Sequence, residues 1–271
     1  MPELPEVETT VRGLEPVLDG RRIESIELRR GDLRRPFPED LRQRLTGARV
    51  TGLSRRAKYG LIHTDRDDTM VFHLGMSGRW RIDPEEIGAH DHLLIGTDEG
   101  RQLSLNDPRR FGSVDLVRTS ELDAFEPFAR MGPEPLGADF DGAWLARTLE
   151  GRSAPIKALL LDQRVVAGLG NIYVCEALHM AGIAPSRAGG QIATPRLDRL
   201  AAAIKEVLRA AIAAGGSTLR DYARPDGELG YFAKDWRVYG REGENCPNCR
   251  RAVRRKVDSG RSTFFCAKCQ R

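Results

Sequence analysis

Four cysteines near the C-terminus constrain the fold of this chain more than any other feature. Cys246 and Cys249 form one C-x2-C pair, and Cys266 and Cys269 form a second pair after sixteen intervening residues. Each pair can supply two thiolates to a tetrahedral metal, and this spacing is typical of a zinc site. We therefore expect one structural Zn²⁺, which would supply folding energy to a segment too short for a large core. Disulfides are the alternative, although nothing in the sequence marks the chain as secreted. The fifth cysteine, Cys175, is expected to be a buried, inert thiol.

The positive charge of the chain is concentrated around these cysteines. The whole chain has a formal charge of +4, whereas residues 246–271 carry +7 and the rest therefore about −3. One acidic residue, Asp258, lies among eight basic ones: Arg250, Arg251, Arg254, Arg255, Lys256, Arg261, Lys268 and Arg271. Four thiolates on Zn²⁺ would subtract two charges and still leave a basic surface suited to phosphate groups. A solvated basic tail is the simpler alternative.

The length of 271 residues and the hydrophobic content of 40% suffice for two domains with their own cores. The chain contains no run of about eighteen uncharged apolar residues, and no apolar run follows a basic N-terminus. We therefore expect no membrane segment and no export signal. The sequence favours a cytoplasmic protein, and we expect a monomer.

Hydrophobic spacing predicts a helix followed by a β-rich region. Apolar residues recur every three or four positions from Leu4 to Leu18, and Gly20 follows as a helix terminator. Residues 20–118 are typical of β structure, with strand-like runs at 21–30, 47–54, 59–64, 69–82, 92–97 and 101–106.

The second half of the chain is predicted to be helical. The stretch 131–142 is rich in Gly, Pro and Asp, as expected of a connection between domains. Helices are expected over 143–149, 156–161 and 171–183, and a longer one begins at Thr194 and Pro195. The predicted domains are residues 1–130, a linker and start of the helical domain at 131–150, the helical domain at 151–235, and the zinc unit at 236–271. Two helices around a short turn, followed by a basic zinc unit, indicate nucleic-acid binding.

The N-terminus has a composition that suits covalent catalysis. Removal of Met1 would leave Pro2 as a free secondary amine. An α-amino group is neutral to about a tenth at pH 7, whereas a lysine is almost entirely protonated. Attack of such an amine on a sugar carbon gives a cationic iminium, from which β-elimination can proceed, and Glu3 can move protons. An ordinary helix start with proline and carboxylates is the alternative.

Seven short motifs are distributed along the chain. They are PELPEVE at 2–8, RRAKYG at 55–60, HLGMSG at 73–78, NDPRRFG at 106–112, GLGNIY at 168–173, VYGR at 238–241 and FFCAKCQR at 264–271. Together they resemble the bacterial formamidopyrimidine-DNA glycosylases. The resemblance implies an α+β multidomain fold, with an N-terminal β-sandwich and N-terminal helix, a helix-two-turn-helix domain and a C-terminal zinc finger. It also implies a bifunctional DNA glycosylase and AP lyase that removes oxidised purines from damaged double-stranded DNA and nicks the strand.

The same resemblance implies the catalytic residues. Pro2 matches the family's Schiff-base nucleophile at the sugar C1′, and Glu3 matches its proton donor. Lys58 matches a second proton donor in β-elimination, and Arg261 matches the arginine that serves δ-elimination and holds phosphate. Phosphate contact alone is the alternative for Lys58 and Arg261. Glu6 either orients the site or is a surface acid.

Three further side chains match residues that enter the DNA when a base is extruded. The hole left in the stack must be filled, and apolar wedges are a physical means of doing so. Met76, Arg109 and Phe111 match these inserting residues. Without the resemblance, Met76 would be assigned to a core.

Other positions match the family's DNA contacts. The phosphate-binding matches are His73, Lys157 and Asn171, and further contacts are expected at His90, Arg109 and Arg152. Asn171 stands at a predicted helix start, which favours phosphate and also suits a simple cap. His90 suits an exposed turn equally well. A polar loop over 217–239 is expected to close over the extruded base.

Two other functions are also compatible with the sequence. The endonuclease VIII branch, which removes oxidised pyrimidines, shares the terminal proline and glutamate, the lysine and the zinc finger. The PELPEVE and NDPRRFG motifs and the polar loop after Ser217 favour the purine branch. A non-catalytic zinc-dependent DNA-binding protein is the second alternative, and the presence of Pro2, Glu3 and Lys58 together argues against it.

Overall fold

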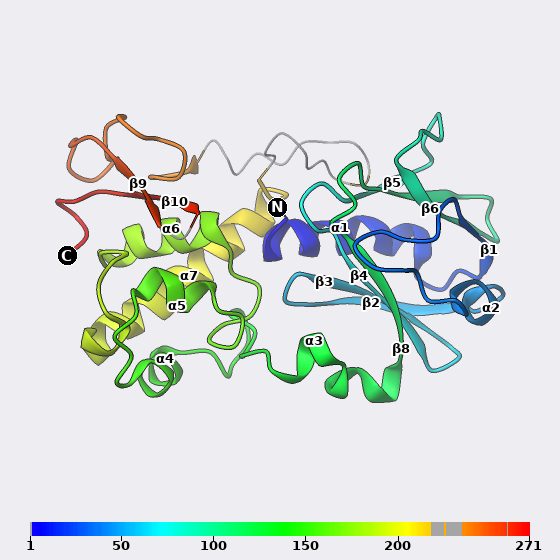
Figure 1. The fold of residues 1–271 in the computed structure, drawn as a ribbon, viewed down its shortest axis with the longest axis horizontal. Helices are drawn as coiled ribbons and strands as arrows, with labels where there is room; N and C mark the ends of the chain where they lie inside the picture. Colours follow the sequence, from blue (N-terminus) through cyan, green and yellow to red (C-terminus); the bar gives the residue numbers. More distant parts are fainter. Residues whose placement is uncertain (1, 218–224, 226–234, 259) are drawn as a thin grey trace. The chain divides into compact units, whose positions relative to one another are not determined.

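A computed structural model describes residues 2–217, 225, 235–258 and 260–271 (Figure 1). Contacts divide the chain into two compact units, one of residues 1–129 and 214–231 and the other of residues 130–213 and 232–271. The predicted loop over 217–239 lies mostly outside the described residues. No helix in the described part of the chain has the length and hydrophobicity needed to cross a bilayer.

The first unit begins with the predicted helix, α1 (Leu4–Leu18). Glu3 and Glu6 form a capping box, in which the backbone N–H of Glu3 donates to Glu6 Oε2 at 2.8 Å. The chain leaves the helix through Gly20, whose φ of +72° lies in the left-handed region that glycine adopts without steric cost. The apolar stripe of α1 is buried, as the spacing predicts.

Two antiparallel four-stranded sheets make up the rest of this unit. The first has the order β1-β6-β7-β5, with β1 (Ile23–Leu28), β6 (Asp91–Thr97), β7 (Gln102–Asn106) and β5 (Arg79–Ile82). The second has the order β2-β3-β4-β8, with β2 (Val50–Arg56), β3 (Tyr59–Thr64), β4 (Asp68–His73) and β8 (Ser113–Arg118). The short elements α2 (Leu41–Leu45), η1 (Thr119–Ala124) and α3 (Glu126–Ala129) lie between or after the strands.

The two sheets share one hydrophobic core. Phe72 of β4 and Trp80 of β5 meet edge to face across it, with ring centroids 5.6 Å apart, and α1 packs against β2, β3 and β5. The β-sandwich with an N-terminal helix is therefore confirmed. The single strand-like run predicted over 69–82 is wrong in detail, because residues 74–78 turn the chain from one sheet into the other.

The second unit is built on helices. It contains α4 (Gly142–Leu149), α5 (Ile156–Leu161), α6 (Asn171–Ala181), η2 (Gly189–Gln191) and α7 (Thr194–Ala213), followed by a hairpin of β9 (Arg254–Asp258) and β10 (Arg261–Phe265). α7 packs against α4 and α6, and α6 packs against β10. Figure 1 shows the hairpin beside α6. This packing fixes the basic hairpin on α6.

Candidate active site and metal centre

The residues that begin the chain are held in the interior of the first unit. Pro2, Glu3 and Glu6 are all buried. Glu6 accepts two backbone N–H groups at 2.8 Å, that of Glu3 on Oε2 and that of Ser217 on Oε1. Hydrogen bonds of this kind to a carboxylate are among the stronger ones in proteins. Glu6 therefore holds Glu3 in place and is no surface acid.

Lys58 lies in the tight turn between β2 and β3, where Ala57 has a φ of +54°. Arg55 fixes this turn by donating to the carbonyl of Ala57 at 2.9 Å and to Glu8 Oε2 of α1 at 3.0 Å. Burial would raise the pKa of Glu8, but its hydrogen bonds to Arg55 and Arg12 hold that pKa below the usual value. The Lys58 side chain is buried. The turn that carries it is thus tied to the helix that follows Pro2 and Glu3.

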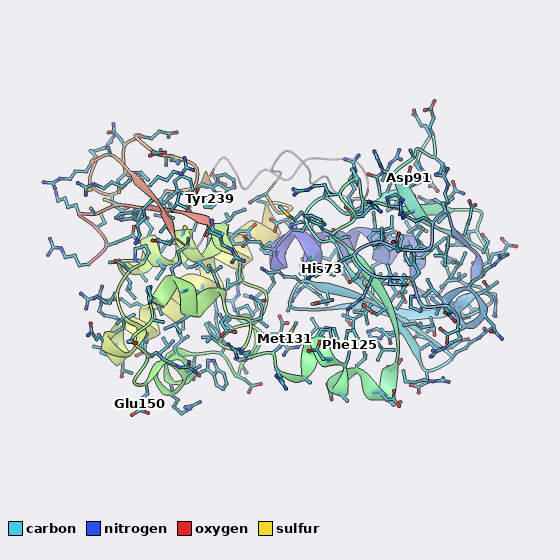
Figure 2. All side chains as sticks on the ribbon, in the orientation of Figure 1. His73, Asp91, Phe125, Met131, Glu150 and Tyr239 are labelled. Atoms are coloured by element: carbon cyan, nitrogen blue, oxygen red, sulfur yellow. The ribbon has the colours of Figure 1, made fainter. Side chains whose placement is uncertain are left out.

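His73 ends β4 (Figure 2) and has a defined tautomer. The Gly75 backbone N–H donates to His73 Nδ1 at 3.0 Å, so the neutral ring carries its proton on Nε2. Burial, together with the nearby charges of Lys58, Arg34 and Arg35, lowers the pKa of His73 to about 4. At neutral pH this side chain is therefore a neutral donor, suited to a phosphate oxygen.

The three predicted insertion residues lie on two touching loops, 74–78 and 107–112. Met76 is 36% exposed and Phe111 45% exposed, which excludes the core assignment for Met76. The Arg109 guanidinium lies over the Phe111 ring, 4.9 Å from its centroid. A Cβ on Gly75 would come within 2.3 Å of the Phe111 carbonyl carbon, so the loops pack without room for a side chain there.

His90 joins the same group of loops. Its side chain is exposed, and its carbonyl accepts the Asp107 backbone N–H at 2.9 Å. The neighbouring His92 is buried, and its Nε2 bonds to the Asp107 carbonyl at 3.0 Å. Of the two histidines, His90 is the one available to a ligand.

In the second unit, Lys157 and Asn171 contact strand β10 of the β9–β10 hairpin. Lys157 Nζ donates to the Ser262 carbonyl at 3.1 Å and to Thr263 Oγ1 at 2.7 Å. Burial lowers the pKa of the Lys157 ammonium group, which lies next to these two polar acceptors. Asn171 is the first residue of α6, and its Nδ2 donates to the same Ser262 carbonyl at 2.8 Å. Both predicted phosphate ligands therefore also support the hairpin.

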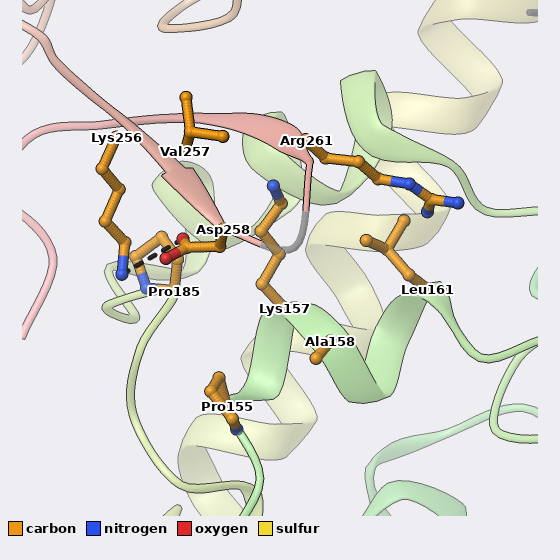
Figure 3. Close-up of a pocket in the computed structure, with 9 residues that line it drawn as sticks. All are labelled: Pro155, Lys157, Ala158, Leu161, Pro185, Lys256, Val257, Asp258 and Arg261. Atoms are coloured by element: carbon orange, nitrogen blue, oxygen red, sulfur yellow. Dashed lines mark ion pairs between the residues drawn. The ribbon is translucent and has the colours of Figure 1, made fainter.

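A cavity of about 610 Å³ lies between α5 and this hairpin (Figure 3). It is lined by Pro155, Lys157, Ala158, Leu161, Pro185, Lys256, Val257, Asp258 and Arg261. Lys256 pairs with Asp258 at 3.1 Å, and the two other cations leave the lining positive. Such a lining favours an anionic ligand. Arg152 lies in the exposed turn between α4 and α5 and does not line this cavity.

The four C-terminal cysteines form a metal site. Their Sγ atoms all lie within 4.8 Å of one another, with Cys246 and Cys269 3.9 Å apart and Cys249 and Cys266 3.4 Å apart. A tetrahedral zinc with Zn–S bonds of about 2.3 Å needs sulfur atoms about 3.8 Å apart. The cluster fits one Zn²⁺. None of the five cysteines, all of them described, forms a disulfide, and Cys175 is buried as predicted.

Three buried side chains of these two units escaped the sequence reasoning. Glu176 of α6 accepts the backbone N–H groups of residues 237–239. His179 contacts Cys246 Sγ through Nε2 at 3.3 Å, and Asp107 joins the two insertion loops. The sequence did contain a signal for Glu176, because it is the single acidic residue in the largely apolar run NIYVCEALHMA.

The fold and the sites define a class of protein, a zinc-containing DNA-binding protein with a β-sandwich and a helical domain. Three family models match the chain: the formamidopyrimidine-DNA glycosylase N-terminal domain over residues 1–114, the formamidopyrimidine-DNA glycosylase H2TH domain over 131–223, and the zinc finger found in FPG and IleRS over 243–271. The chain belongs to the formamidopyrimidine-DNA glycosylase family. The resemblance seen in its motifs is thereby confirmed.

Related proteins match this chain over its whole length. Formamidopyrimidine-DNA glycosylases of Rhizorhabdus wittichii and Novosphingobium aromaticivorans are 75% and 69% identical to it over 271 residues, 100% of each chain. The solved structure of the MutM (Fpg) protein from Thermus thermophilus matches with a TM-score of 0.90 and 40% identity, over 99% of this chain and 98% of that one. Lactococcus lactis Fpg in complex with an N7-benzyl-Fapy-dG containing DNA matches with a TM-score of 0.91 and 36% identity, over 99% of both.

Proposed function

We propose that this protein is a bifunctional DNA glycosylase and AP lyase of base excision repair, acting on oxidised purines such as 8-oxoguanine and formamidopyrimidines in duplex DNA. The observation that carries the proposal is the arrangement at the N-terminus, where Pro2 precedes a buried Glu3 whose backbone is held by Glu6. Membership of the glycosylase family over the full chain supports it. Action on the chromosome would place the enzyme at the nucleoid.

The proposed reaction uses the secondary amine that Pro2 acquires when Met1 is removed. Its nitrogen attacks C1′ of the damaged nucleotide, the bond from C1′ to the base breaks, and the base leaves with a proton. Glu3 supplies a proton to the sugar oxygen as the ring opens and an iminium forms. Loss of a C2′ proton then expels the 3′ phosphate, with Lys58 as a second proton donor, and a further elimination assisted by Arg261 expels the 5′ phosphate.

The remaining residues hold the DNA in this proposal. His73 donates its Nε2–H to a phosphate, and Lys157, Asn171, His90 and Arg152 bind further phosphates. Met76, Arg109 and Phe111 fill the gap left by the extruded base. The zinc ion folds the basic hairpin, so the thiolates carry no step of the reaction.

Borohydride trapping tests the proposal. The full-length protein is incubated with a duplex carrying 8-oxoguanine opposite cytosine, and the cross-linked peptide is identified by mass spectrometry. An adduct on Pro2 is expected, and a Glu3→Gln variant should form it more slowly. If the adduct formed only on a duplex that carries an oxidised pyrimidine, the enzyme would be assigned to the endonuclease VIII branch. No adduct on either duplex, with Met1 absent and zinc bound, would refute the catalytic assignment.

A further inference from the structure

Asp107 is the first residue of loop 107–112 and contacts loop 74–78, and these two loops carry the predicted insertion residues. It is fully buried, and its carboxylate accepts two hydrogen bonds, from the Ser77 hydroxyl on Oδ1 at 2.7 Å and from the Gly112 backbone N–H on Oδ2 at 2.8 Å. The first bond reaches loop 74–78, and the second closes loop 107–112 on itself. One carboxylate thus joins both loops.

Ser77 strengthens the same junction. Its hydroxyl oxygen accepts the backbone N–H of Arg109 at 3.2 Å while its proton goes to Asp107. The main chain of Asp107 adds a third loop, because its N–H donates to His90 and its carbonyl accepts from His92. We name Asp107 and Ser77 the loop clamp.

The glycines around the clamp mark places where the loops pack too closely for a side chain. Gly75 has a φ of +60° and packs against the backbone at Phe111, and a Cβ on Gly112 would lie 2.8 Å from the His73 carbonyl oxygen. Burying a carboxylate is costly unless donors satisfy it, so a charge at this place needs a compensating gain. Holding exposed side chains in their working geometry before the ligand arrives is such a gain, since it reduces the ordering cost of binding.

We propose that Asp107 and Ser77 are positioning residues that hold Met76, Arg109 and Phe111 ready to enter the DNA at the extruded base. This inference rests on the proposed function. The clamp itself touches no substrate atom. Its loss should weaken the step that distinguishes a damaged duplex from an undamaged one, and it should leave the contacts to phosphate unchanged.

The test uses Ser77→Ala with a matched control in the same domain. Ser104 is also a buried serine that donates to a buried carboxylate, Asp91, at 2.8 Å, but it lies on β7 outside the insertion loops. Ser104→Ala removes the same kind of bond and leaves Asp91 with Asn106 and Arg81 as partners. Both variants are therefore expected to lose similar thermal stability.

Two measurements on the zinc-loaded, full-length proteins follow. In the free protein, Ser77→Ala should speed amide hydrogen exchange in 74–78 and 107–112 at least fivefold, and Ser104→Ala should not. With DNA, Ser77→Ala should reduce the preference for a tetrahydrofuran-containing duplex over an undamaged one at least tenfold, with the affinity for undamaged duplex within twofold of wild type. Ser104→Ala should keep the preference within twofold.

The outcomes separate this inference from the proposed function. Unchanged exchange in the two loops of Ser77→Ala overturns the clamp, whatever the DNA data show. Faster exchange with an unchanged duplex preference, or an equal loss of preference in Ser104→Ala, overturns the positioning role. Failure of the wild-type protein to excise 8-oxoguanine would instead refute the proposed function, while the exchange data would still decide whether the clamp holds the loops.

Discussion

Replacing Glu176 by alanine is expected to destabilise the second unit by about 3 to 5 kcal/mol. The carboxylate of this buried residue accepts three backbone N–H groups, from Arg237 at 2.8 Å, Val238 at 3.0 Å and Tyr239 at 2.8 Å. A buried donor left without a partner costs about 1 to 3 kcal/mol. The full cost applies at the buried Val238, and a smaller one applies at its two neighbours, which are closer to water.

The geometry also predicts a graded series. Oε1 accepts from Val238 and Tyr239, whereas Oε2 accepts from Arg237 alone. In Glu176→Gln the remaining oxygen can keep two bonds and the amide nitrogen faces the third donor, so a loss of about 1 to 2 kcal/mol is expected. Glu206→Ala, an exposed glutamate on α7, serves as the control and should change stability by less than about 0.5 kcal/mol.

Urea denaturation followed by tryptophan fluorescence measures these differences on zinc-loaded protein. A loss below about 1 kcal/mol in Glu176→Ala, or equal losses in Glu176→Ala and Glu176→Gln, would refute the argument from unsatisfied donors. The loss of stability should extend to a predicted DNA-binding residue, because the Tyr239 hydroxyl lies 3.5 Å from Asn171 Nδ2. The Tyr239 ring also meets the Phe264 ring edge to face, with ring centroids 5.0 Å apart.

Three further results are expected. Cys249→Ser or chelation should remove one zinc per chain, measured by metal analysis, and abolish duplex binding, since the hairpin would lose its folding energy. The pKa of His73 is about 4 in the fold and near 6.5 in the unfolded chain, so the unfolded chain binds the extra proton and His73 alone should lower stability by about 2 kcal/mol between pH 7 and pH 5. Urea titrations at both pH values should show a smaller fall in His73→Asn. Six to ten phosphate contacts should reduce duplex affinity by about three to five decades between 50 and 200 mM salt, and a nearly flat titration would contradict the electrostatic account.

Elements with a strong local pattern were predictable from the sequence. The helix from Leu4 to Leu18, the strand Tyr59–Thr64 and the helix Ile156–Leu161 have the bounds that the hydrophobic spacing and turn residues indicate. The strand Ser113–Arg118 and the helix Leu41–Leu45 were not identified. The strand is defined by its pairing with the distant β4, and the helix is too short for a clear period.

The candidate sites also differ in how far the sequence alone predicts them. The zinc ligands follow from spacing alone, because a tetrahedral ion needs two close pairs of thiolates. The role of Pro2 follows from the chemistry of a terminal amine together with the family resemblance, those of Lys58 and Arg261 follow from the resemblance alone, and all three stay predictions. The exposure of Met76 could not be derived from the sequence, since a methionine beside a β-strand ordinarily belongs to the core.

Buried carboxylates are the part of this molecule that sequence reasoning reaches least. Glu6, Asp107 and Glu176 are charged residue types that ordinarily lie on the surface, yet each is buried and accepts backbone N–H groups from residues outside its own helix or strand. A carboxylate can bond two or three such donors at once, which no neutral side chain does as strongly. Loops that must present exposed side chains in one geometry have few apolar contacts to hold them. At the loop clamp the interior carboxylate of Asp107 supplies that hold, so Met76 and Phe111, which are proposed to enter the DNA, stay exposed while the groups that position them are buried.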